Sequence, residues 1–112
     1  MYCIFDTETG GLDPKVHALL TVAFVMKPDL DKDYIACVQE FRMNPGEYEV
    51  TDGALAVNGY TREEIAGWPD REETAESIKR FLEDWGRMGA FIPAGHNLIF
   101  DKGFLLQVLP EH

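Results

Sequence analysis

The stretch YCIFDTETGG, residues 2–11, decides the fold of this chain. Its first four residues are apolar, rich in aromatic and branched side chains, and too few to make a helix. A short apolar run of this kind, ended by a polar segment with glycines, is typical of a buried central strand. We therefore expect a strand over residues 2–5, with the carboxylates of Asp6 and Glu8 at its end.

Two apolar runs farther along the chain extend this strand into a sheet. They cover residues 19–26 and 34–43, and a turn-like segment at residues 29–33 separates them. Three consecutive strands with short connections favour an antiparallel meander. A fourth strand is expected over residues 91–95. Because a helix crosses over before it, this strand should lie parallel to the first one.

Capping signals predict the helices that follow the meander. A threonine and aspartate begin, and an Asn-Gly pair ends, a helical stretch within residues 51–59. Thr61 and Glu64 have the spacing of a capping box for a helical turn over residues 62–66. The longest helix begins at Asp70, and its apolar positions recur on one face. These positions are Ala75, Ile78, Phe81, Leu82, Trp85 and Met88.

The composition describes one small acidic domain. The chain has 112 residues, 46% of them hydrophobic, and 10 Lys+Arg against 20 Asp+Glu give a net charge of −10. Such a chain can pack a core but cannot form two domains. The acidic balance argues against nucleic-acid binding through a broad basic surface, so any such contact must be local or mediated by metal.

The same composition indicates a cytoplasmic protein without membrane contact. No apolar run approaches the roughly 20 residues that a membrane span needs. The first residues lack the basic and small-residue pattern of a secretory signal. Cys3 and Cys37 lie in apolar runs and outside any zinc-binding pattern, so we expect both to be buried free thiols.

Asp6 and Glu8 are candidate metal ligands. Their i, i+2 spacing directs both carboxylates to one face if the strand continues, and such oxygen ligands suit Mg²⁺ or Mn²⁺. The spacing alone is weak evidence, since an Asp-x-Glu is expected about 0.9 times by chance at this composition, and residues 70–72 form a second one at a helix start. The context distinguishes the first pair, because an apolar strand precedes it and a Thr-Gly-Gly turn follows it.

A second candidate lies where the fourth strand leads into a last helix, expected over residues 97–109. The sequence GHNLIFD, residues 95–101, places Asn97 as a helix N-cap and Asp101 one turn later. An ordinary capped helix with an acid in its first turns explains this pattern equally well. Parallel strands, however, end at the same edge of a sheet. Asp101 would then converge with the first two carboxylates.

Three segments of the sequence resemble a known family. FDTETGGL (residues 5–12) and HNLIFD (residues 96–101) resemble the first and second motifs of the DEDD superfamily of 3′-to-5′ exonucleases, which includes the proofreading subunits of bacterial replicative polymerases. ALAVNGYT (residues 54–61) is similar to a segment of that family's nucleotide site. The resemblance implies a ribonuclease H-like fold that hydrolyses phosphodiesters at the 3′ end of single-stranded DNA or RNA, with two divalent metals, Mg²⁺ or Mn²⁺.

The same resemblance implies roles for individual residues. The catalytic metal ligands would be Asp6, Glu8 and Asp101. The substrate-binding residues would be Thr9, Leu12, Asn58 and Asn97. Among these, Leu12 would be wedged near the terminal base.

The family's third motif, a His or Tyr followed by a final Asp, is absent from these 112 residues. It supplies a metal ligand and the general base. Neither His17, expected in a solvated loop, nor His96, expected to be structural, replaces it. We therefore expect one exonuclease-like domain over residues 1–112 that stops before the last strand and helix of the fold and is weakly active or inactive by itself. The alternative is a non-catalytic module that binds nucleic acid or protein.

A fold that stops there would leave apolar surface uncovered. The residues expected on this surface are Phe91, Ile92, Phe104, Leu105 and Leu109. An open strand edge beside apolar side chains favours association. We therefore expect either a homodimer or the binding of a C-terminal completing segment.

Overall fold

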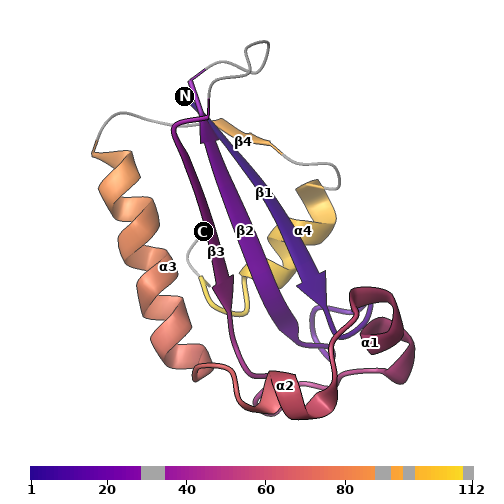
Figure 1. Ribbon diagram of the computed structural model, residues 1–112. Coiled ribbons are helices and arrows are strands. Elements are labelled where there is room, and N and C mark those ends of the chain that lie inside the picture. Colours follow the sequence, from indigo (N-terminus) through magenta and orange to yellow (C-terminus); the bar gives the residue numbers. More distant parts are fainter. Residues whose placement is uncertain (29–34, 88–91, 95–97, 110–112) are drawn as a thin grey trace.

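The computed structural model describes residues 1–28, 35–87, 92–94 and 98–109 of the chain. Figure 1 shows the arrangement of the helices and strands. In chain order they are β1 (Tyr2–Thr9), β2 (Leu19–Lys27), β3 (Cys37–Arg42), α1 (Asp52–Asn58), α2 (Arg62–Ala66), α3 (Arg71–Gly86), β4 (Ile92–Ala94) and α4 (Leu98–Leu105). In these parts of the chain, no helix has the length and apolar character that crossing a membrane requires.

The four strands form one mixed sheet in the order β3-β2-β1-β4. β2 pairs antiparallel with both β1 and β3, while β4 runs parallel to β1. The predicted meander and parallel fourth strand are therefore confirmed. β1 is longer than predicted, because its pairing with β2 extends from Tyr2 to Thr9. Asp6 and Glu8 thus lie inside the strand rather than beyond its end.

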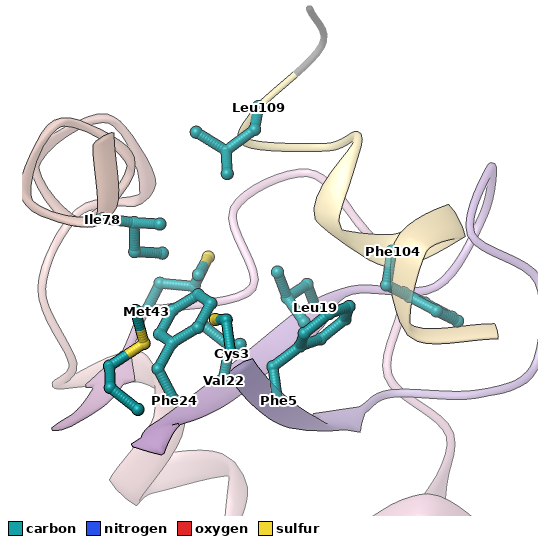
Figure 2. Packing of buried hydrophobic residues seen from close by; sticks show 10 residues of the cluster. Cys3, Phe5, Leu19, Val22, Phe24, Met43, Ile78, Phe104 and Leu109 are labelled. Atoms are coloured by element: carbon teal, nitrogen blue, oxygen red, sulfur yellow. The ribbon is translucent and has the colours of Figure 1, made fainter. Parts of the chain in front are cut away.

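The two faces of the sheet have different surroundings. Side chains alternate along a strand, so Cys3 and Phe5 point to one face and Ile4, Asp6 and Glu8 point to the other. α3 and α4 cover the face of Cys3 and Phe5, where Figure 2 shows residues from both helices packed on the strands. On the opposite face Val38 is 63% exposed. The two acidic residues therefore lie on the less covered face.

Two hydrophobic clusters hold these layers together. In the larger one, the Phe24 ring of β2 lies 6.3 Å from Phe5 and 5.4 Å from Phe81 of α3, measured between ring centroids. The smaller cluster packs α1 and α2 at the end of the sheet where β1 ends (Figure 1), and its buried members are Ala18, Leu20, Leu55 and Ile65. Burying one large apolar side chain contributes about 1.5–3 kcal/mol. Both clusters therefore stabilise the position of β1 and of the segments after it.

The helix ends agree with most of the capping signals. Thr51 accepts a hydrogen bond from the Ala54 amide at the start of α1, and Gly59 ends this helix with a left-handed backbone (φ 80°). The capping box of Thr61 and Glu64 is present at α2. These contacts confirm the two short helices.

The predicted last helix is too long at its C-terminal end. α4 ends at Leu105, and the chain continues in turns, in which the amides of Gln107 and Val108 donate to the carbonyls three residues before them. Phe104 is fully buried and Leu109 is 6% exposed. Both belong to the hydrophobic cluster drawn in Figure 2. The expectation that these two side chains are uncovered is therefore wrong, because the helix and its final turns direct them into the core.

Both cysteines are free, as predicted, but only Cys3 is buried as expected, whereas Cys37 is half-buried. Cys3 lies in the main core, where burial raises the pKa of its thiol to about 11. This thiol stays protonated, and hence unreactive, at neutral pH.

Candidate metal and nucleic-acid site

The candidate site begins with two carboxylates on one face of β1. In the pairing with β2, Asp6 lies opposite Ala23 and Glu8 lies opposite Thr21, so small side chains flank both acids. Asp6 is exposed, whereas Glu8 is half-buried. The Oε2 atom of Glu8 is buried and has no hydrogen-bond partner among the residues that the structure describes. The predicted common face is therefore confirmed, and it contains a buried oxygen that lacks a donor.

Tyr60 adjoins Glu8 and was not predicted to belong to the site. Burial and, second, the interaction with Glu8 raise the pKa of the Tyr60 phenol to about 12. The ring is held edge-on against Trp68, with the centroids 4.8 Å apart. Tyr60 therefore stays neutral at physiological pH beside Glu8, although it makes no hydrogen bond to the Oε2 atom in the structure. The only signal in the sequence was its place directly after Asn58-Gly59.

Asp101 reaches β1 from α4, but on the other side of the strand. It is 3% exposed, and its Oδ1 atom accepts a hydrogen bond of 2.6 Å from the Thr7 hydroxyl. Thr7 lies between Asp6 and Glu8 in sequence, so the alternation of the strand directs it to the opposite face. This contact ties the two predicted motifs together. No local pattern predicts it, because the two residues lie 94 positions apart in sequence.

The three carboxylates do not form one cluster. Within residues 1–28, 35–87, 92–94 and 98–109, no three His, Cys, Asp or Glu side chains gather closely enough to hold a metal ion. The expected convergence is therefore only partial: α4 brings Asp101 to the strand of Asp6 and Glu8 but not into a common group with them. Asn97 and His96 lie outside the described residues.

The turn after β1 is packed tightly against the rest of the chain. The amide of Gly10 donates to the Ala18 carbonyl at 2.7 Å, and its own carbonyl accepts from the Thr51 amide at 2.8 Å. A Cβ atom on Gly10 would lie 2.7 Å from the Glu49 carbonyl oxygen. The glycine is thus required by the close approach of another backbone. Its amide serves the fold rather than a ligand.

The predicted substrate-binding residues around this turn differ in their contacts and exposure. The Thr9 hydroxyl donates to the Gly11 carbonyl at 2.7 Å, and the Asn58 side-chain amide donates to the Thr9 carbonyl at 3.0 Å. Both side chains therefore hold the turn in place. Leu12 is 83% exposed at its tip. An apolar side chain held out in this way is available to contact a ligand.

His17 differs from the prediction of a solvated loop residue. It is half-buried, its Nδ1 atom accepts from the Asp13 amide at 3.1 Å, and its ring fills the space where a side chain on Gly11 would lie. The glycine leaves room for the imidazole to fold back over the turn. The histidine therefore contributes to the structure of the loop.

Behind this loop, Gln107 and Arg71 form a half-buried polar network. Arg71 donates to the carbonyls of Leu19 and Asn44 and to Gln107, and its guanidinium lies 4.8 Å from the centroid of the Tyr48 ring. Burial lowers the pKa of Arg71. No sequence motif predicted this network, because a single glutamine near a helix end has no distinctive pattern.

The comparisons with known proteins concern the fold of the chain. No family model matches the chain. The PolC-type DNA polymerase III of Latilactobacillus sakei subsp. sakei (strain 23K) is 31% identical over 104 residues, which are 93% of this chain and 6% of that protein. E. coli exonuclease I in complex with a dT13 oligonucleotide has a TM-score of 0.80 at 20% identity, over 97% of this chain and 23% of that chain. Its zinc-bound complex with single-stranded DNA also has a TM-score of 0.80.

The sheet and its helices have the ribonuclease H-like fold of the DEDD exonucleases. This confirms, at the level of the fold, the resemblance that the motifs indicated. In particular, the chain is similar to the part of exonuclease I that these superpositions cover. It spans about a quarter of the exonuclease I chains and a far smaller share of the polymerase.

Proposed function

We propose that this chain is a DEDD-type exonuclease domain, which binds the 3′ end of a single-stranded nucleic acid and hydrolyses its terminal phosphodiester with the aid of divalent metal. The observation that carries the proposal is the pair of Asp6 and Glu8 on one face of β1, with the buried Oε2 atom of Glu8 lacking a hydrogen-bond partner in the part of the chain that the structure describes. The fold supports it, since two of the similar exonuclease I structures are complexes with dT13 and dA16 oligonucleotides.

The residues of the site fit a hard divalent cation. Burying a carboxylate oxygen without a hydrogen-bond donor costs free energy. Mg²⁺ or Mn²⁺, which prefer oxygen ligands, would bind this oxygen and balance its negative charge. In this proposal Asp6 and Glu8 hold the metal. Asp101, which accepts from Thr7 on the other face of β1, does not join them in the structure. A bound divalent metal lowers the pKa of a water molecule and stabilises the leaving oxygen in phosphodiester hydrolysis.

The turn after β1 supports a substrate role for Leu12. Leu12 is 83% exposed although the loop around it is fixed by hydrogen bonds. We propose that Leu12 contacts the terminal base and that Thr9, Asn58 and Asn97 line the nucleotide pocket. Because Asn58 holds the Thr9 carbonyl, these two residues would act together.

Two further parts of the proposal concern partners and location. β4 is at one edge of the described sheet, and its Ile92 is 56% exposed. We propose that this edge accepts a strand from a second copy or from a completing segment. We also place the protein in the cytoplasm, where free thiols such as Cys3 and Cys37 remain reduced.

Metal binding is tested by the thermal stability of the chain in Mn²⁺. Ligand at a hundredfold excess over its Kd stabilises by about 2.7 kcal/mol, so the wild-type Tm should rise by several degrees. Asp6→Asn should lose this rise. Asp84→Asn is the matched control, since Asp84 is exposed on α3 in a surface pair with Arg87. Equal shifts in wild type and Asp6→Asn would contradict the metal site.

Activity is tested on 5′-labelled single-stranded DNA and RNA, which the isolated chain should shorten from the 3′ end in Mn²⁺ only weakly, at least about a hundredfold more slowly than a complete relative. Glu8→Gln should lower the rate by about a hundredfold or more, as expected when a group that acts on the reacting atoms is lost. The control is Glu83→Gln on the exposed side of α3. Binding of the oligonucleotides without any hydrolysis would instead identify the chain as a non-catalytic binding module.

A further inference from the structure

The side-chain amide of Gln107 makes four hydrogen bonds, which is the full capacity of this group. Its Oε1 atom accepts from the Leu19 amide at 3.0 Å and from the Nη2 atom of Arg71 at 2.6 Å. Its Nε2 atom donates to the carbonyls of Pro14 and His17, both at 2.7 Å. One side chain after α4 thus connects the loop at residues 10–18, the start of β2 and the start of α3.

The neighbours of Gln107 determine which way its amide faces. Arg71 and the Leu19 amide can only donate, so the oxygen must face them and the nitrogen must face the loop. The two loop carbonyls can only accept, which agrees with this orientation. The amide therefore cannot rotate by half a turn without losing all four bonds.

The loop also packs directly on α4. A Cβ atom on Gly103 would come within 3.5 Å of the Pro14 ring, so the loop already lies against the helix at this glycine. The same loop presents Leu12, and the same helix contains Asp101. The hydrogen bonds of Gln107 thus join the loop that presents Leu12 to the helix that contains Asp101.

We propose that Gln107 is a positioning residue, which fixes the loop at residues 10–18 on α4 and thereby sets the place of Leu12 relative to Asp101. This inference rests on the proposed function, in which Leu12 contacts the terminal base. Gln107 itself touches neither the metal ligands nor the proposed base contact. It acts through the carbonyls of Pro14 and His17.

Two substitutions separate this role from general stabilisation. Gln107→Glu keeps both accepted bonds and places a carboxylate beside Arg71, but it cannot donate to the loop carbonyls. Gln107→Met has a similar length and loses all four bonds. We expect Gln107→Glu to unfold near the wild-type Tm and Gln107→Met to unfold several degrees lower.

Amide hydrogen exchange in the free chain reports on the loop directly. In Gln107→Glu the Leu19 amide should stay protected, while the amides of Val16 and His17, which both donate to the Asp13 carbonyl, should exchange faster. In Gln107→Met all three should exchange faster. Unchanged exchange at Val16 and His17 in both variants would overturn the inference.

The link to Leu12 is measured with a double-mutant cycle on the binding of a fluorescent oligothymidylate. Residues that act through each other are coupled by roughly 0.5–3 kcal/mol, which is about 2-fold to 150-fold in Kd. We expect Gln107→Glu to weaken binding at least about fourfold when Leu12 is present, and by less than about twofold when Leu12 is replaced with alanine. Leu106→Glu adds the same charge at a 49% exposed neighbour and controls for repulsion of the nucleic acid.

The outcomes distinguish the two proposals. Equal weakening by Gln107→Glu in both backgrounds would overturn the positioning role and leave the proposed function intact. If the wild-type chain does not bind the oligonucleotide, or if Leu12→Ala leaves its affinity unchanged, the proposed contact of Leu12 fails. The positioning role would then be overturned with it, whatever the exchange result.

Discussion

At the scale of single residues, the backbone around Gly10 leaves no room for a side chain. Gly10→Ala would place a Cβ atom 2.7 Å from the Glu49 carbonyl oxygen and 2.9 Å from the Val50 Cα atom. Both are backbone atoms, so the chain itself must move. We expect a loss of about 1–3 kcal/mol in the free energy of unfolding, as is usual for overpacking. Urea denaturation measures this loss.

Gly53→Ala is the control for this substitution. Gly53 lies in α1, and a Cβ atom there would meet nothing within 4 Å. Alanine in a helix should stabilise by roughly 0.5–1 kcal/mol relative to glycine. Equal effects of the two substitutions would show that Gly10 is not tightly packed.

Single residues also show how far the sequence alone could predict the site. The common face of Asp6 and Glu8 follows from the alternation of any strand, and it was predictable. The contact of Tyr60 with Glu8 depends on the packing of α1 and α2 against the end of β1. Such a contact joins residues far apart in sequence, and no local pattern encodes it.

At the scale of elements, one hydrogen bond connects β1 with α4. The Thr7 hydroxyl donates to Asp101, which is almost fully buried. Hydrogen bonds to charged groups contribute about 1.5–3 kcal/mol. We expect Thr7→Val to lower the free energy of unfolding by this amount in urea denaturation.

Thr9→Val is the matched control for Thr7→Val. The Thr9 hydroxyl donates to the neutral Gly11 carbonyl, so its loss should cost only about 0.5–1.5 kcal/mol. If Thr7→Val is no more costly than Thr9→Val, the bond to Asp101 does not contribute to the attachment of α4.

The bounds of the elements were predictable where a local signal exists. Thr61 and Glu64 begin α2 with a capping box, and Gly59 ends α1. β1 continues past Phe5 because β2 pairs with it, and α4 ends at Leu105 because the following turns direct Leu109 into the core. These two bounds depend on tertiary contacts, which the local sequence does not contain.

At the scale of the whole molecule, we propose that two chains associate through the edge of the sheet at β4. Ile92 is 56% exposed on this edge. We expect the chain to form dimers at high micromolar concentration, and Ile92→Lys to shift it toward monomer in sedimentation equilibrium. Salt should strengthen the dimer, because screening reduces the repulsion between two chains of net charge −10.

Ile99→Lys is the control for association, since Ile99 is 89% exposed on α4 and does not lie on the strand. Dimers that respond equally to both substitutions would place the interface elsewhere. A wild-type chain that stays monomeric would contradict the proposed edge contact.

Each of the two hydrophobic clusters has one tryptophan packed against it, whose fluorescence can report on that part of the molecule. The sequence has two tryptophans, and Trp85 packs against the larger cluster while Trp68 packs against the smaller one. Replacing either one with phenylalanine would leave a single emitter in a known place. The fluorescence of Trp68 would then follow the end of the molecule with the turn after β1, and the fluorescence of Trp85 would follow the body of the sheet. Unequal midpoints for the two signals would reveal that these regions open separately.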